Sequence, residues 1–134
     1  MLISPGDQVA LGVAGASGFQ NRLSTVALGG GDFNTWTHIA VTVDRDSASG
    51  ISYYLNGALL GSAQDPTAYQ GVSIAANQDL QIASANALPF NGSLDDLAIY
   101  SQVLSPGQIA SLADGSLMKT PSWKRRWTPV PVMS

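Results

Sequence analysis

The asparagine–glycine pair at residues 56–57 is the feature that most limits what this chain can fold into. The preceding stretch "ISYYL" places Ile51, Tyr53 and Leu55 at alternate positions, and a shorter apolar stretch follows the pair. A two-residue type I′ turn needs positive φ at both central residues, which asparagine and glycine tolerate best. Alternate residues of a strand share one face. The stretch therefore predicts an antiparallel hairpin whose first strand has one buried face.

Similar apolar stretches recur along the chain and predict an all-β fold. They are short, and segments rich in glycine, serine and aspartate separate them. The further predicted strands cover residues 9–13, 23–28, 36–44, 80–84 and 92–100. A chain of 134 residues can bury one core but not two. We therefore predict one domain over residues 1–115, a two-layer antiparallel β-sandwich, with residues 64–78 as a long polar loop.

One short helical turn is predicted after the last strand, close to residues 106–113. Its signals are an N-cap serine, a first-turn proline, a capping-box glutamine and a terminating glycine: Ser105, Pro106, Gln108 and Gly115. Leu104 and Ile109 have the spacing of a hydrophobic staple. The helix is therefore expected to be fixed to the sandwich at its start.

The charges divide the chain into an acidic body and a basic tail. All nine acidic residues are aspartates, and four of the six cations lie within residues 119–126. Nine aspartates against two arginines give the body a net charge of −7, which argues against binding to a nucleic-acid backbone. Such a body is compatible with neutral ligands and with Ca²⁺, which prefers oxygen ligands. Residues 116–134, with their prolines and cations, are predicted to be an extended or disordered appendage.

Two adjacent carboxylates interrupt the last predicted strand. In a regular strand Asp95 shares a face with Leu97 and Ile99, while Asp96 points to the other face. We therefore expect Asp95 to be largely buried. A buried carboxylate is either hydrogen-bonded or bound to a metal. Asp95 is thus expected either to hold a neighbouring loop through backbone N–H groups or to ligate Ca²⁺, and it is the candidate metal ligand.

Three sequence blocks, in order, resemble a known family. "WTHIAVTVD" is similar to a Trp-x-His-Val-Ala-Val-Thr strand, and "YYLNGALLGSA" to a Tyr-x-Asn-Gly hairpin. "FNGSLDDLAIYSQVLSPGQI" is similar to a Gly-x-Ile-Asp-Asp/Glu strand followed by a Leu-Ser-x-x-x-Ile turn. Together they resemble a laminin-G-like domain of the concanavalin A-like lectin/glucanase superfamily. The resemblance implies a jelly roll in a larger exported or cell-surface protein.

The resemblance also implies strands that this chain lacks. Family members usually have one or two strands before the first matched block, so the domain is expected to be truncated at its N-terminus. The rest of a longer protein, or another chain, would then supply the missing strands. The chain shows no signal peptide pattern and no apolar run of the ~20 residues that a membrane helix needs.

Catalysis is not predicted for this chain. In the superfamily that the chain resembles, the enzymes that cleave β-glucans carry a Glu-x-Asp-x-x-Glu strand. This chain has no glutamate. Retaining hydrolysis needs two carboxyl groups about 5 Å apart. The single histidine, His38, accompanies no recognised nucleophile motif. The chain is therefore expected to be a non-enzyme.

Sugar binding would use an exposed aromatic ring beside hydrogen-bonding side chains. The place of Trp36 in the first family block implies that it packs inward, so Tyr54 and Tyr69 are the candidate ligand-binding residues. Tyr69 is chosen because it lies in the long loop. We predict a recognition module for carbohydrate or a surface protein. The alternatives are an adhesion or spacer domain without a small ligand, and a non-catalytic remnant of a glycoside hydrolase.

Overall fold

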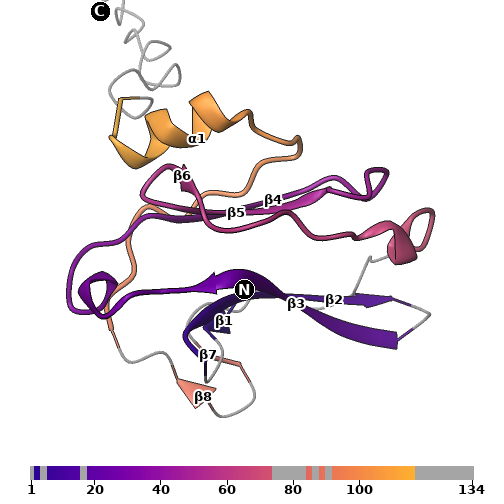
Figure 1. The fold of residues 1–134 in the computed structure, drawn as a ribbon, viewed down its shortest axis with the longest axis horizontal. Coiled ribbons are helices and arrows are strands. Elements are labelled where there is room, and N and C mark those ends of the chain that lie inside the picture. Colours follow the sequence, from indigo (N-terminus) through magenta and orange to yellow (C-terminus); the bar gives the residue numbers. More distant parts are fainter. Residues whose placement is uncertain are drawn as a thin grey trace, which may run out of the picture.

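The computed structural model describes residues 2–3, 6–15, 18–73, 84–85, 88–89 and 92–116. Two antiparallel three-stranded sheets lie one above the other, and a helix covers the outer side of one of them (Figure 1). The first sheet has the order β1-β2-β3, with β1 at Leu2–Ile3, β2 at Gln8–Gly15 and β3 at Gly18–Ala27. The second has the order β4-β5-β6, with β4 at Ile39–Val43, β5 at Ile51–Leu55 and β6 at Ala58–Leu59. The predicted all-β sandwich is confirmed.

Five further elements are assigned in the described part of the chain. Two are single turns of 3₁₀-helix, η1 at Gly30–Asp32 and η2 at Thr67–Tyr69. A two-stranded ribbon joins β7, Ser84–Ala85, to β8, Leu88–Pro89. The helix α1 spans Pro106–Ala113, as the capping signals predicted.

The hairpin of β5 and β6 turns at the predicted asparagine–glycine pair. The φ angles are +49° at Asn56 and +83° at Gly57, which is the left-handed pair that a type I′ turn requires. The Asn56 side chain also accepts a hydrogen bond from the His38 backbone N–H at 2.9 Å. This turn is therefore tied to the chain that leads into β4.

The main core lies between the two sheets. It consists of side chains from β2, β5 and the segments that follow β3 and β6: Val9, Leu28, Ile51, Tyr53 and Leu60. The Tyr53 hydroxyl donates a 2.7 Å hydrogen bond to the Arg22 carbonyl, and so links β5 to β3 across this core. Burial raises the pKa of the Tyr53 hydroxyl, while a backbone hydrogen bond to Leu11 and the Arg22 charge act in the lowering direction with smaller effect.

A second, smaller core lies on the outer face of β4 and β5, beneath α1. Tyr54, Leu104 and Ile109 are buried together there, with Ala40 and Leu112 packed against them. The contact of Leu104 with the helix confirms the predicted staple. Because α1 covers this outer face, the second sheet has packed side chains on both of its faces.

The capping box of α1 forms as predicted. The Ser105 hydroxyl accepts a hydrogen bond from the Gln108 backbone N–H at 3.3 Å, and the Gln108 side chain accepts one from the Ser105 N–H at 2.9 Å. Gly115 follows the helix with a φ of +71°. The two hydrogen bonds at the start of the helix satisfy the backbone N–H groups of Ser105 and Gln108, so the helix begins at the predicted residue.

The predicted strand over residues 92–100 is wrong. These residues form no strand, and Asp96 has a φ of +51°, which an extended strand does not adopt. The Asp95 side chain accepts a hydrogen bond from the adjacent Asp96 N–H at 2.8 Å. The alternation rule assigns faces only in a regular strand, and these residues form none.

The expected burial of Asp95 is therefore also wrong. Asp95 and Asp96 are both exposed, and so are the two aliphatic side chains expected to share a buried face with Asp95. Leu97 is 63% exposed and Ile99 is 74% exposed. No sheet covers this segment within the described part of the chain, so neither face of it is a core face.

Trp36 also departs from its prediction, because it is 73% exposed rather than packed inward. Of the strand predicted at residues 80–84, only residue 84 lies within the described residues, where β7 begins. The proposed boundary of the domain near residue 115 and the character of the tail stay predictions, since residues 117–134 lie outside the described residues.

Candidate functional site

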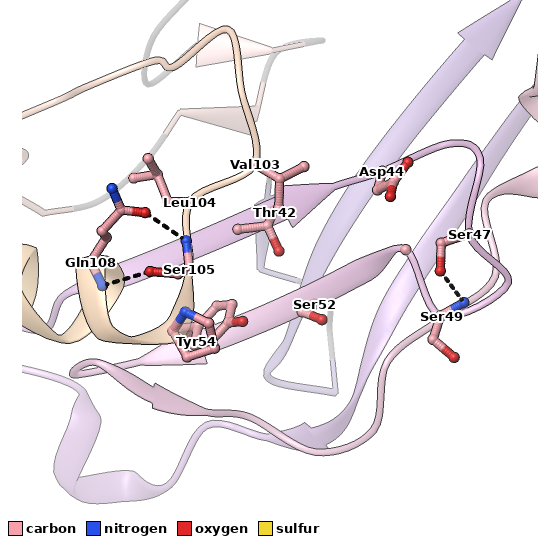
Figure 2. Close-up of a pocket in the computed structure, with 12 residues that line it drawn as sticks. Thr42, Asp44, Ser47, Ser49, Ser52, Tyr54, Val103, Leu104, Ser105 and Gln108 are labelled. Atoms are coloured by element: carbon pink, nitrogen blue, oxygen red, sulfur yellow. Dashed lines mark hydrogen bonds between the residues drawn. The ribbon is translucent and has the colours of Figure 1, made fainter.

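A pocket of about 390 Å³ opens on the outer face of β4 and β5, beside the start of α1 (Figure 2). Its lining comes from both strands, from the loop that joins them, and from the segment leading into the helix. Most of the lining side chains are short and polar: Thr42, Asp44, Ser47, Ser49, Ser52, Ser105 and Gln108, beside Tyr54, Val103, Leu104, Gly50 and Pro106. The pocket thus brings together three segments that are far apart in the sequence.

The floor of the pocket is the outer face of the β4–β5 ladder. Thr42 lies directly opposite Ser52 in this antiparallel pair, and Tyr54 follows two residues along β5. Since Ile51 and Tyr53 enter the main core, the alternation of the strand places Ser52 and Tyr54 on the other side. The register of one hairpin therefore sets the floor of the pocket.

The loop between β4 and β5 forms one wall and is held in place by its own backbone. The Asp44 N–H donates to the Gly50 carbonyl at 2.8 Å, and the Asp44 carboxylate accepts a bond from the Asp46 N–H at 3.0 Å. A Cβ atom at Gly50 would lie only 1.7 Å from the Asp44 carbonyl oxygen, so this position needs glycine. The Ser47 hydroxyl accepts a bond from the Ser49 N–H at 3.3 Å.

The opposite wall is the start of α1. Ser105 and Gln108 bond to each other there, as Figure 2 shows, and this uses two backbone N–H groups of the helix start. Those two donors are therefore not offered to a ligand. Leu104 lines the wall and also packs under the helix, which fixes the wall to the sheet.

Four hydroxyl groups in the pocket have no hydrogen-bond partner among the described residues. They belong to Thr42, Ser49, Ser52 and Tyr54. None is buried without a partner, so each is accessible to water or to a ligand. A hydroxyl can donate one hydrogen bond and accept others. Together with the Asp44 carboxylate, which only accepts, these hydroxyls give the pocket both donors and acceptors.

Tyr54, predicted as an exposed ring for sugar stacking, is only 5% exposed. Its ring packs against Leu104 and Ile109, yet the residue still lines the pocket. Tyr54 is thus at the site, although α1 covers most of its ring. Contact of Tyr54 with a ligand stays a prediction, and its hydroxyl is the group that could make it.

Tyr69 does not reach this pocket. It lies in η2 and is 2% exposed, and its carbonyl accepts a hydrogen bond from the Arg45 side chain at 2.9 Å. Tyr69 was expected to present its ring to a ligand because it lies in the long loop, but the structure buries it. Ligand contact by Tyr69 stays a prediction, but its expected exposure is wrong.

Asp95 lies outside the pocket, and its predicted role as a calcium ligand stays a prediction. Among the described residues, no group of three or more histidine, cysteine, aspartate or glutamate side chains is placed to hold a metal ion. The pocket itself contains one carboxylate, that of Asp44. Of the described residues that line the pocket, none brings a second carboxyl group to face Asp44.

The polar residues of the pocket floor were missed by sequence reasoning, although a signal was present. In "IAVTV" and "ISYYL" the residues between the core positions include a threonine and a serine, Thr42 and Ser52, rather than only apolar side chains. Such residues mark an outer face that is not fully covered. Their pairing across the ladder could be obtained only from the register.

Two antiparallel sheets packed face to face, joined to a capped helix, define an antiparallel β-sandwich domain. The sequence profile described as the concanavalin A-like lectin/glucanases superfamily, of laminin G-like type, matches residues 1–110. The chain belongs to this superfamily, as the three sequence blocks indicated.

One solved structure to which the chain is similar is an S-layer domain-containing protein (residues 221–444) from Clostridium thermocellum. It is 24% identical, with a TM-score of 0.39, and the match covers 79% of this chain and 50% of that one. The chain thus spans about half the length of this structure, and the likeness carries no argument about function. No curated protein matches the chain significantly. Among the described residues, no helix is long and apolar enough to cross a membrane.

Proposed function

We propose that this chain is a non-catalytic recognition module that binds carbohydrate in the pocket on the outer face of β4 and β5. The observation that carries the proposal is the group of four hydroxyls, beside the Asp44 carboxylate, for which the described part of the chain provides no hydrogen-bond partner. Sugar hydroxyls both donate and accept hydrogen bonds, so they match this mixed set of groups. The volume of about 390 Å³ lies at the lower end of the range of about 300–1,000 Å³ for ligand pockets.

The charge of the pocket favours a neutral sugar. Among the described residues that line the pocket, Asp44 carries the only charge, and the body of the chain has an excess of aspartates. A carboxylate that accepts hydrogen bonds from sugar hydroxyls makes stronger bonds than a neutral acceptor does. It repels the carboxylate or sulfate of an acidic sugar at the same range.

A non-catalytic role, which is part of the proposal, also fits this lining. Hydrolysis of a glycosidic bond by the usual mechanisms needs a pair of carboxyl groups that flank the bond. The pocket supplies one, and the chain contains no glutamate. A remnant of a glycoside hydrolase would also fit these facts, but it would share the same binding role.

The setting that we propose is the outside of a cell, in a larger exported or surface protein. Membership of the laminin G-like group supports this setting, since such domains are commonly modules of surface proteins. A protein ligand and a spacer without a small ligand are the competing functions. Only sugar binding in the pocket predicts that removing a pocket hydroxyl weakens the affinity for a sugar.

The test begins with a glycan array and continues with calorimetric titration of any neutral sugar that it detects. We expect Thr42→Val and Ser52→Ala each to weaken binding by about three- to tenfold, the loss that one net hydrogen bond of about 0.5–1.5 kcal/mol produces. Ser62→Ala is the matched control, because Ser62 is exposed and lies outside the pocket. It should leave the affinity unchanged.

Two results would overturn the proposal. No binding to any sugar on the array would favour the spacer or a protein ligand. Binding that all three variants leave unchanged would place the sugar site elsewhere on the domain.

A further inference from the structure

The pocket on the outer face of β4 and β5 has two unlike sides. On the side of the β4–β5 loop, the lining groups are the Asp44 carboxylate and the hydroxyls of Ser47 and Ser49 (Figure 2). On the side of the segment that leads into α1, the lining includes Val103 and Pro106, whose side chains carry no polar atom. A ligand that fills the pocket therefore meets hydrogen-bonding groups on one side and an apolar surface on the other.

Val103 is the large apolar side chain that this second side leaves open to water. It is 53% exposed, whereas Tyr54 and Leu104, which also line the pocket, are 5% and 8% exposed because they pack under α1. In the described part of the chain, Val103 packs into neither of the two cores. Its surface is thus available to a ligand, and removing apolar surface from water on binding is favourable.

The position of Val103 is fixed by the residues that follow it. Leu104 is anchored beneath α1, and the Ser105 N–H donates a hydrogen bond to the Gln108 side chain at 2.9 Å. A valine side chain also has few rotamers, because its Cβ atom carries two methyl groups. A ligand that contacts Val103 therefore loses little free energy in ordering this side of the pocket.

We propose that Val103 makes the pocket selective for a neutral sugar that carries a methyl group, and that this methyl group packs against the valine. The inference rests on the sugar binding proposed above and adds which sugars the pocket selects. The methyl group belongs either to a 6-deoxyhexose or to the acetamido group of an N-acetylhexosamine, and both offer valine the same contact. The sugar hydroxyls then point to the opposite side, where Asp44, Ser47 and Ser49 lie.

The chemistry of Val103 also penalises the hydroxyl group that an ordinary hexose has in this place. A valine side chain offers no hydrogen bond, so a hydroxyl packed against it loses part of its hydration without compensation. A methyl group in the same place gains from burial. Covering one methyl-sized group contributes about 0.8 kcal/mol, which corresponds to an affinity about fourfold higher.

The test is calorimetric titration of the full chain with two pairs of sugars. L-Fucose is compared with L-galactose, which has a hydroxyl on its sixth carbon atom where fucose has none. N-acetylglucosamine is compared with glucose, which has a hydroxyl in place of the acetamido group. In at least one pair, we expect the sugar with the methyl group to bind about fourfold more tightly than its parent. The pair that shows the preference identifies the source of the methyl group.

The variant Val103→Thr replaces one methyl group of the pocket by a hydroxyl and keeps the shape of the side chain. It should abolish the preference within the selective pair. Val26→Thr is the matched control, because Val26 is 48% exposed and lies on β3, outside the pocket. The control should leave both affinities unchanged.

Three results would overturn the inference while leaving sugar binding in the pocket intact, provided that Thr42→Val still weakens the binding. The first is equal affinity within both pairs, and the second is a preference that Val103→Thr does not change. The third is binding confined to sugars without a methyl group on the glycan array. Absence of binding by every sugar would overturn the inference and the proposed function together.

Discussion

Gly57 in the β5–β6 turn gives the sharpest test of how the helix packs on the second sheet. Its φ of +83° suits glycine, and an added Cβ atom would lie 2.9 Å from the Cα atom of Ala110 and 3.2 Å from the Cβ atom of Ala113. Both contacts are on α1. Gly57→Ala would therefore combine backbone strain in the turn with a clash against the helix.

The two costs can be separated because another glycine has the first without the second. Gly71 has a φ of +68°, and a Cβ atom there would meet nothing within 4 Å. The left-handed conformation costs a residue with a Cβ atom about 1–2 kcal/mol. Overpacking against a backbone that must move adds about 1–3 kcal/mol. We expect Gly71→Ala to show only the first cost and Gly57→Ala to show both.

The measurement is the free energy of unfolding from urea titration of the wild type and the two variants. Near-ultraviolet circular dichroism in the same series would follow Tyr54, which lies beneath α1. Equal destabilisation by Gly57→Ala and Gly71→Ala would refute the packing of α1 over the turn. An unchanged stability of Gly57→Ala would refute the left-handed turn itself.

Three single side chains give further predictions, which depend on a hydrogen bond of Tyr53, the helix cap at Ser105 and the exposure of Asp95. Tyr53→Phe should cost about 0.5–1.5 kcal/mol, because it removes the part-buried 2.7 Å hydrogen bond to the Arg22 carbonyl. Burial raises the pKa of the Tyr53 hydroxyl from its ordinary value of 10.0. The contribution of the neutral hydroxyl to stability should therefore be complete below that pH and be lost as the pH rises through the raised pKa. Alkaline melts would show this loss in the wild type, and the Phe variant should not show it. Ser105→Ala should cost about 1 kcal/mol in urea titration through loss of the helix cap, and an unaffected stability would argue against the observed capping box. Asp95→Ala should change the free energy of unfolding by less than about 0.5 kcal/mol, because the side chain is exposed. A melting temperature that calcium raises in the wild type, but not in Asp95→Ala, would instead identify Asp95 as a calcium ligand.

Local signals in the sequence were sufficient for the hairpin and the helix. The turn at Asn56 and Gly57 depends on φ angles that few residues adopt, and the cap of α1 depends on side chains within four residues of one another. Each contact is made between close neighbours, so the chain encodes it without reference to the rest of the fold. The two-layer sandwich followed from the same alternation and from the resemblance of three blocks.

The faces of the last segment could not be obtained in this way. Alternation predicted that Asp95 would be buried with Leu97 and Ile99, yet burial depends on whether another strand or sheet covers the segment. The same holds for Trp36, whose inward packing was inferred from its place in a family block. In both cases a property of neighbours in space was inferred from neighbours in sequence.

The candidate site shows the same division. The sequence by itself determined that Thr42 and Ser52 lie on strands, that Tyr54 follows the core residue Tyr53, and that a capped helix begins at Pro106. Only the tertiary structure decided that the register pairs Thr42 with Ser52 and that α1 folds back over Tyr54, which forms the pocket. The physical reason is that a hydrogen-bonded turn is a local event, whereas a pocket exists only where segments distant in the chain pack with a gap between them.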